Sequence, residues 1–497
     1  MISYIQTVVV VPTVSPIKLE VSGEERQSVD EEKAREIVAS WTDELSIQRE
    51  KVRDILGNDA TESEVRNVIL CDRISLSGKS YSPEASNIIA AFLSGPFEGG
   101  RSLSSGILDA QLGDIIAGLQ TAEGLHVLRT ICDAFADSNR LKILNLSNNA
   151  IGLLGIRLCT TLLSKSSLQA IELCDNGLSA EAMEIVAHTL TQDESGNGCV
   201  AANLSKIHFF NNNSGDEGCR HLASILENCS NLKDLRFAST HTGRAGTDMI
   251  TSALVAALED GRNVGLGRLD LNDNNFGNRA SQDDLRSILE RTRTSLYHLD
   301  IGWCSLGSEG VAAVCDVLVS SESSLEHLDL SGNGVESQGA EQIADYIRNC
   351  GGKLKVLCLD DNDLTSEGVL HITSAFLDSE SGRSIEILEL NSTMCDDIGA
   401  RALIEASANL PNLNKICLDS NFFQEEIVRA LLDVFGDKLE EMEENDPNGE
   451  ADDDVADDDS NEEADDNDVP DVAGDDVPPD VDSFLADHMS RLSMNSS

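Results

Sequence analysis

The chain has 497 residues, of which 40% are hydrophobic and only 4% aromatic, and its formal net charge is −52. This length supports a large buried core, and the scarcity of aromatic residues favours layers of Leu, Ile and Ala. The negative charge argues against binding to nucleic acid or anionic membranes, and it favours a basic protein partner that is attracted by long-range, salt-dependent steering.

The amino terminus, MISYIQTVVVVP, has an apolar run that ends at Pro12 and lacks a preceding basic segment. Such a run is too short to span a bilayer and makes a poor signal peptide. The 13 cysteines occur singly, without CxxC pairs or Cys/His clusters at zinc spacing, which favours reduced thiols in the cytosol. We expect a cytoplasmic protein with no membrane span, no metal and no cofactor, and a perinuclear or nuclear location stays open as an alternative.

Residues 1–64 are predicted to form an N-terminal segment and cap. Within them, residues 25–56 are charged and follow a helical pattern, and a repeat array needs such an element to cover its first apolar face. Two degenerate repeat copies follow, VRNVILCDR at Val65 and ILDAQLGDIIAG at Ile107.

A tenfold repeat then fills the chain as far as residue 436. Each copy follows the pattern LxxLxLxx(N/T/C)xL, and successive copies begin 27 to 36 residues apart. This pattern is the signature of leucine-rich repeats, and with the two degenerate copies it predicts about twelve repeats in residues 65–436. The ten copies begin at Leu141, Leu168, Leu204, Leu232, Leu266, Leu296, Leu325, Leu354, Ile385 and Leu413.

Each copy is predicted to form a short strand followed by a helix. The xLxL part alternates as a strand with one buried face must, and the segment after it has helical periodicity, as in residues 181–190. We therefore predict an α/β fold, a curved leucine-rich-repeat solenoid like that of ribonuclease inhibitor. Its parallel strands line the concave face and its helices the convex face.

An asparagine recurs just after the predicted strands. Its amide can satisfy backbone groups that are left unpaired where the chain turns inward, so we interpret these asparagines as structural. Thr240, Cys304 and Thr393 hold the same place in three other copies. The asparagines are Asn149, Asn176, Asn212, Asn274, Asn333, Asn362 and Asn421.

The carboxyl-terminal part changes character. Residues 437–482 hold 23 of the 88 acidic residues, with breakers such as Pro470 and without apolar periodicity, which predicts a disordered acidic tail. Residues 483–497 regain apolar residues at the spacing of a short amphipathic helix. The GxxxxGK[ST] and GxGxxG motifs of nucleotide-binding sites, the GxSxG motif of hydrolases and the HExxH motif of zinc proteases do not occur. The sequence therefore favours binding over catalysis of its own.

Several segments carry a family resemblance. The chain resembles the Ran GTPase-activating proteins, above all the plant-type branch, although the Trp-Pro-Pro motif of that branch does not occur. The resemblance implies that the protein binds the GTP-bound small GTPase Ran and stimulates hydrolysis of the bound GTP by positioning residues of Ran, in nucleocytoplasmic transport. We also expect a monomer. The matching segments are DIIAG at Asp114, LNLSNNAIGLLG at Leu144, HFFNNNSGDEG at His208 and ENDPNGEADDD at Glu444.

Two positions depart from the family pattern. The resemblance puts a catalytic asparagine where this chain has Asp175, and an arginine where it has Leu119. The first change removes an amide donor and adds negative charge near a phosphate-bearing partner, and the second removes a charge-assisted contact. Two interpretations stay open, a divergent activator and a Ran-binding or general interaction scaffold that has lost activity.

A ribonuclease-inhibitor-like binder of a basic protein is a third interpretation, although the acidic tail and the smaller number of cysteines count against it. In each case we expect the partner at the loops that leave the strands along one rim. Solvated loops without a partner are the alternative for each residue. Besides Asp175, the candidate contact residues are Asp114, Leu119, Asn176, Asn211, Asp216, Glu217 and Asp273.

Overall fold

The computed structural model describes residues 15–57, 61, 65, 68–97, 101–192, 198–319 and 323–447. The predicted segment 483–497 and the acidic residues from 448 onward lie outside the described residues. The chain divides into two compact units, Met1–Ile207 (unit 1) and His208–Ser497 (unit 2). In the described part, no helix combines the length and the apolar character that crossing a membrane requires.

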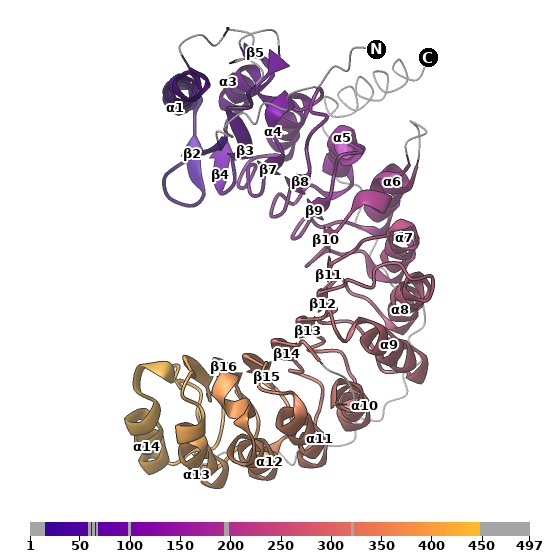
Figure 1. Ribbon diagram of the computed structural model, residues 1–497, viewed down its shortest axis with the longest axis vertical. Coiled ribbons are helices and arrows are strands. Elements are labelled where there is room, and N and C mark those ends of the chain that lie inside the picture. Colours follow the sequence, from indigo (N-terminus) through magenta and orange to yellow (C-terminus); the bar gives the residue numbers. More distant parts are fainter. Residues whose placement is uncertain are drawn as a thin grey trace, which may run out of the picture. The chain divides into compact units, whose positions relative to one another are not determined.

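In unit 1, parallel strands stack in chain order, and helices cover one face of the sheet (Figure 1). Two small pairings flank it, β2 (Gln27–Val29) with β4 (Lys79–Tyr81), and β5 (Pro96–Phe97) with β6 (Arg101–Ser102). The main strands are β1 (Ile17–Glu20), β3 (Cys71–Ser75), β7 (Asp109–Gln111), β8 (Ile143–Asn145) and β9 (Ala170–Glu172). The helices are α1 (Glu31–Leu56), α3 (Pro83–Ser94), α4 (Thr121–Asp133), α5 (Gly152–Leu163) and α6 (Ala180–Thr191).

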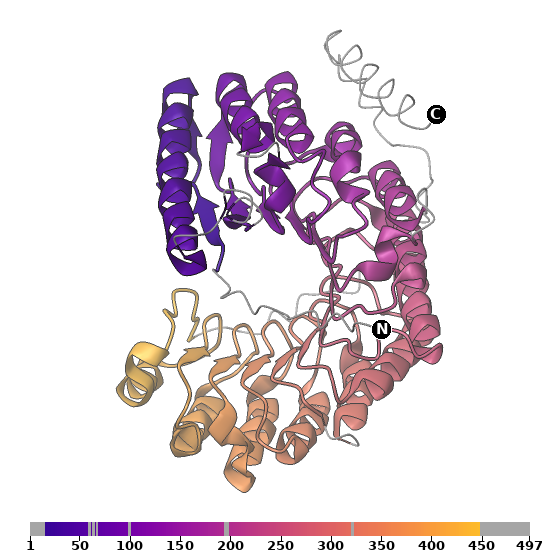
Figure 2. The ribbon, with the colours of Figure 1, turned by 45° about the horizontal axis from the view of Figure 1, so that its top comes forward.

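Unit 2 repeats this arrangement, with strands on the concave face and helices on the convex face (Figures 1 and 2). The unit boundary falls within β10 (Lys206–His208). The strands are β11 (Asp234–Arg236), β12 (Arg268–Asp270), β13 (His298–Asp300), β14 (His327–Asp329), β15 (Val356–Cys358), β16 (Ile387–Glu389) and β17 (Lys415–Cys417). The helices are α7 (Gly215–Asn228), α8 (Arg244–Glu259), α9 (Arg279–Thr292), α10 (Gly307–Val319), α11 (Ser337–Asn349), α12 (Thr365–Asp378), α13 (Asp397–Ala406) and α14 (Glu425–Phe435). The predicted leucine-rich-repeat fold is confirmed.

The first degenerate repeat begins at Cys71, so its predicted start at Val65 is wrong. Cys71, Ile74 and Leu76 are buried at the LxxLxL positions, and Ile74 pairs with Ala110 of the next strand. A cysteine in place of the first leucine hides the register of this copy in the sequence. Residues 17–56 also add a strand and a helix to the array, because β1 pairs with β3 and α1 packs on α3.

The asparagine ladder has the structural role that its spacing predicts. The Oδ1 atom of Asn362 accepts hydrogen bonds from the backbone N–H groups of Asn333 at 3.1 Å and Val335 at 2.9 Å. Its amide nitrogen donates to the carbonyl oxygens of Leu330 at 3.1 Å and Leu359 at 3.0 Å. Each such side chain therefore satisfies backbone groups of its own repeat and of the repeat before it.

The array extends beyond residue 436, where the disordered tail was predicted to begin. Leu439 forms a bridge with Ile416 of β17. Asn445 accepts from the backbone N–H of Phe423 at 3.0 Å and donates to its carbonyl at 2.9 Å. Residues 437–447 are therefore ordered and close the last repeat, because they satisfy backbone groups that no further repeat covers.

Candidate partner-binding surface

One residue just before each ladder position adopts a left-handed backbone. We call these the rim residues, and their φ angles lie between +51° and +62°. Asp and Asn tolerate this conformation better than most other residues besides glycine. In unit 1 they are Asp114, Asn148 and Asp175, and in unit 2 they include Asn211, Ser239, Asp273, Trp303, Asp361, Ser392 and Ser420.

Four predicted contact residues, Asp114, Asp175, Asn211 and Asp273, lie on this rim. Asn211 and Asp273 are exposed, whereas Asp114 and Asp175 are half-buried. Their position on loops that leave the strands is confirmed, and their contact with a partner stays a prediction.

Asn176, also predicted as a contact residue, lies in the ladder and not on the exposed rim. Its side chain is fully buried, where Oδ1 accepts from the N–H of Asn149 at 3.1 Å and Nδ2 donates to the carbonyl of Leu146 at 3.0 Å. Asp216 also serves the fold, because its Oδ1 accepts from the N–H of Gly243 at 2.7 Å. Glu217 is exposed on the first turn of α7.

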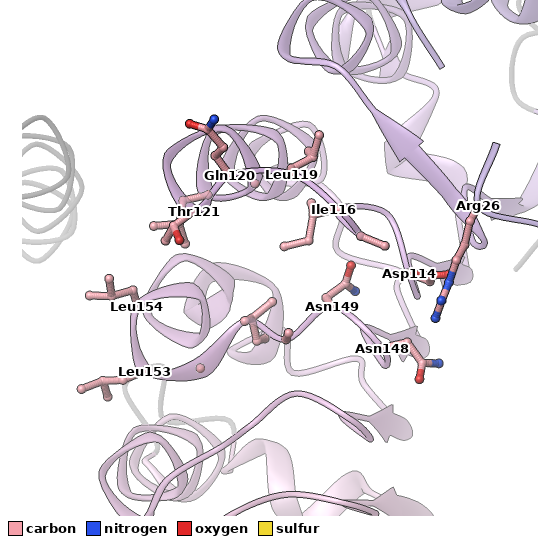
Figure 3. A pocket seen from close by; sticks show the side chains of 17 residues that line it. Arg26, Asp114, Ile116, Leu119, Gln120, Thr121, Asn148, Asn149, Leu153 and Leu154 are labelled. Atoms are coloured by element: carbon pink, nitrogen blue, oxygen red, sulfur yellow. The ribbon is translucent and has the colours of Figure 1, made fainter. Parts of the chain in front are cut away.

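Leu119 lines a pocket of about 560 Å³ in unit 1 (Figure 3). The rim residues Asp114 and Asn148 border the same pocket, and so does Arg26. The Nε atom of Arg26 lies 3.3 Å from Oδ2 of Asp114, and its side chain is 75% exposed. Sequence reasoning missed Arg26, and only its place in the Gly- and Glu-rich loop at residues 23–26 marks it as exposed.

On the concave face of unit 2, the first and third residues of each strand form two rows, because strand side chains alternate between the faces of a sheet. Parallel pairing sets each row in register. The histidine row is Asp234, Arg268, His298, His327, Val356, Ile387 and Lys415. The carboxylate row is Arg236, Asp270, Asp300, Asp329, Cys358, Glu389 and Cys417.

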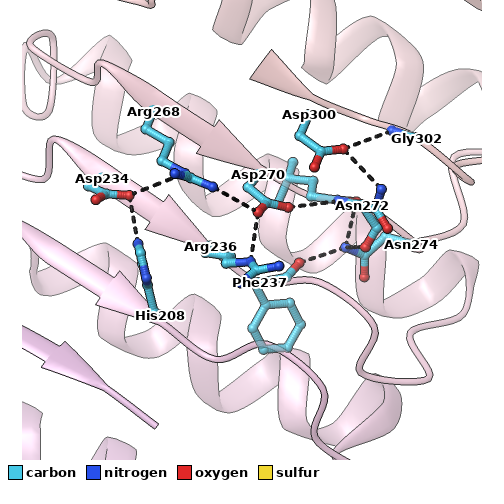
Figure 4. Close-up of polar contacts among 11 residues, drawn as sticks. His208, Asp234, Arg236, Phe237, Arg268, Asp270, Asn272, Asn274, Asp300 and Gly302 are labelled. Atoms are coloured by element: carbon cyan, nitrogen blue, oxygen red, sulfur yellow. Dashed lines mark hydrogen bonds and ion pairs between the residues drawn. The ribbon is translucent and has the colours of Figure 1, made fainter. Parts of the chain in front are cut away.

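An ion-pair network occupies the start of both rows (Figure 4). Asp270 is 1% exposed, and its Oδ2 lies 2.7 Å from Nε of Arg236 and 3.5 Å from a guanidinium nitrogen of Arg268. Asp234 contacts Nε2 of His208 at 2.8 Å and Nε of Arg268 at 3.9 Å. Two guanidinium groups thus compensate the buried carboxylate of Asp270.

Further along, the carboxylate row carries concentrated negative charge. Burial and the neighbouring carboxylates of Asp270 and Asp329 raise the pKa of Asp300 to about 7. Burial also raises the pKa of Asp329. In the histidine row, burial together with His327 and Arg268 lowers the pKa of His298 to about 3. The middle of this face is therefore a place where added positive charge is favourable.

Trp303 stands out on the rim of unit 2. It has a φ angle of +55°, which is unusual for a bulky residue, and it is 52% exposed. Its ring lies across Gly332, where an added Cβ would come within 2.3 Å of the indole. An exposed tryptophan held in this way is a typical anchor for a protein partner.

Taken with the fold, these surfaces define a leucine-rich-repeat protein, an architecture that binds other proteins along its strands and loops. Residues 293–315 and 322–344 match a family model described as Leucine Rich repeat. The chain is 32% identical over 118 residues to RAN GTPase-activating protein 1 of Arabidopsis thaliana, covering 24% of this chain and 20% of that protein. It is 28% identical over 196 residues to the ribonuclease inhibitor of Mus musculus, covering 39% of this chain and 40% of that protein. The matches thus span less than half the length of each relative.

Among solved structures, the fold is similar to a chain of the Rad7 and Elc1 complex of yeast. The TM-score is 0.46 at 14% identity, over 82% of this chain and 93% of that one. An internalin of Listeria monocytogenes gives a TM-score of 0.35 at 12% identity, over 76% of this chain and 82% of that one. These values concern the fold alone.

Proposed function

We propose that this protein activates a small GTPase of the Ran type in the cytoplasm, binding its GTP form along the rim of unit 1. The similarity to an Arabidopsis Ran GTPase-activating protein, 32% identity over 118 residues, supports this partner. The net charge of −52 supports it further, because it favours association with a basic surface. The observation that carries the proposal is the position of Arg26.

Hydrolysis of GTP needs an oriented water and stabilisation of the charge that develops on the phosphate. Leu119 has no positive charge that could stabilise the phosphate. Arg26 lines the same pocket and presents a largely exposed guanidinium. Its contact with Asp114 holds the group in place at Nε. Its terminal N–H groups are suited to a phosphate.

Position 175 holds an aspartate where the family resemblance implies an asparagine, but Asn148 supplies a side-chain amide one repeat earlier. Asn148 is an exposed rim residue with the same left-handed backbone as Asp175. An amide there could orient the glutamine or the water of the GTPase, whereas a carboxylate at 175 opposes the phosphate charge. Arg26 and Asn148 would therefore take over from the two residues that depart from the family pattern.

The test is single-turnover hydrolysis of GTP by Ran with and without the full chain. We expect stimulation by the wild type and a loss of at least about tenfold in Arg26→Ala and Asn148→Ala. Arg35→Ala is the matched control, since Arg35 is an exposed, ion-paired arginine of unit 1 on helix α1. Asp175→Asn should raise the stimulation.

Binding of Ran without stimulation would overturn the activator and favour a Ran-binding scaffold. Neither binding nor stimulation would overturn both. A basic protein bound on the carboxylate row of unit 2 is the second candidate, favoured by the carboxylates of Asp270, Asp300 and Asp329 on that face and by the similarity to a ribonuclease inhibitor.

A further inference from the structure

A mixed group of side chains meets in the middle of the concave face of unit 2. His327 and Asp329 are two residues apart on β14, so both point to the same face of the sheet. Parallel register sets Cys358 of β15 directly beside Asp329. One ligand atom from each residue lies within 4.8 Å of those of the other two.

These three residues offer an imidazole nitrogen, a carboxylate oxygen and a sulfur. Zn²⁺ and similar ions accept all three kinds of donor, whereas Ca²⁺ and Mg²⁺ prefer oxygen alone. We propose that His327, Asp329 and Cys358 bind a divalent transition-metal ion of the Zn²⁺ class on the concave face of unit 2.

Neighbouring groups already orient two of the ligands. Oδ1 of Asp329 accepts from the N–H of Ser331 at 2.9 Å, which holds the carboxylate in place. The ring of His298 stacks on that of His327 with centroids 4.0 Å apart and an interplanar angle of 13°. This stacking restricts the plane of the His327 ring, so His298 acts as a positioning residue.

The charge around the group also suits a cation. Asp300 pairs with Asp329 across β13 and β14. At one end of the carboxylate row, Asp270 forms an ion pair with Arg236, and at the other end Glu389 forms one with Lys415 of the histidine row. A divalent ion at Asp329 would lie between these pairs, where it would offset the repulsion between adjacent carboxylates.

Three protein ligands leave one position of a tetrahedral ion open. Cys358 lies close to Glu389, which also contacts Sγ of Cys417 at 3.9 Å. Glu389 or a water molecule can therefore fill the fourth position. Spacing in the sequence does not reveal this group, because two ligands are separated by one residue and the third comes from the next repeat.

The test is titration of the metal-stripped full chain with Co²⁺, followed by displacement with Zn²⁺. We expect thiolate-to-Co²⁺ charge-transfer absorption and the visible bands of tetrahedral Co²⁺, both lost on adding Zn²⁺. Cys358→Ser should remove the charge-transfer band, and His327→Gln and Asp329→Asn should weaken binding at least about tenfold. Cys417→Ser is the matched control, since Cys417 occupies the same row on β17.

A charge-transfer band that persists unchanged in Cys358→Ser, or wild-type affinity in both His327→Gln and Asp329→Asn, would overturn the site. Circular dichroism checks that each variant is folded. If Cys358→Ser does not fold, the other two variants decide the question. The result is independent of Ran, because stimulation of the GTPase is tested on the rim of unit 1.

Discussion

Asp300 lies beside Asp329 on the neighbouring parallel strand, with their residues paired in register. The pKa of Asp300 rises from 3.8 to about 7, so the folded chain holds this proton more tightly than the unfolded chain does. The Asp300 carboxyl group therefore makes its full contribution to the free energy of unfolding below about pH 4, and this contribution is lost as the pH rises toward 7.

Asp300→Asn should remove this loss of stability at higher pH, because the amide does not ionise. The amide oxygen can still accept from Asn272 and from the N–H of Gly302, as Oδ1 does now. We expect the free energy of unfolding at about pH 8 to rise by roughly 1–3 kcal/mol, with a smaller gain at about pH 5. Urea unfolding at both pH values measures it, with Asp283→Asn on the exposed face of α9 as control. An equal gain at both pH values would contradict the assignment.

Asn362→Ala should strongly destabilise unit 2. The change removes five hydrogen bonds of a side chain that is 1% exposed and leaves buried backbone groups unpaired. We expect a loss of about 2–5 kcal/mol in the free energy of unfolding. Asp363→Ala, at the exposed next residue, should change it by less than about 0.5 kcal/mol. Similar losses in the two variants would argue against the ladder role.

Arg236→Met tests the ion-pair network. The methionine keeps an apolar stem, but Asp270 loses its closest cation, and Phe210 loses the guanidinium that lies 3.8 Å from its ring centroid. We expect a loss of about 2–3 kcal/mol in chemical denaturation, because a buried carboxylate is left with weaker compensation.

Adding Asp270→Asn to Arg236→Met should recover part of this stability, since the uncompensated charge is then gone. Arg279→Met is the control, because the side chain of Arg279 is 92% exposed. Additive losses in the double variant would show that Arg236 and Asp270 do not stabilise each other.

Trp303 makes the rim of unit 2 observable by fluorescence. The chain has two tryptophans, of which Trp41 is 2% and Trp303 52% exposed. Acrylamide should therefore quench mainly Trp303, and Trp303→Phe should leave a blue-shifted, quencher-resistant emission. Gly332→Ala should alter the emission of Trp303, because its Cβ would collide with the ring. Equal quenching of both tryptophans would contradict the exposed position.

The repeat pattern predicted much of the fold because it records burial directly. Leucines at fixed spacing must share one core, and an asparagine between them must satisfy backbone groups, so Asn176 and Asn362 could be assigned from their position alone. The start of the first degenerate repeat is predicted at Val65 rather than Cys71, because a cysteine replaces the first leucine of the pattern. The rim was also predictable in outline, since Asp114, Asp175, Asn211 and Asp273 all leave their strands at the same point of the repeat.

The sequence by itself thus determined the solenoid, its ladder and the position of its rim, because these depend on spacing within one repeat. Only the tertiary structure decided which side chains from different repeats meet. It set Arg26 against Asp114, which lies 88 residues further along the chain, and Cys358 beside Asp329. Those neighbours depend on strand register and loop path, which no local pattern encodes, and the proposed functions rest on them.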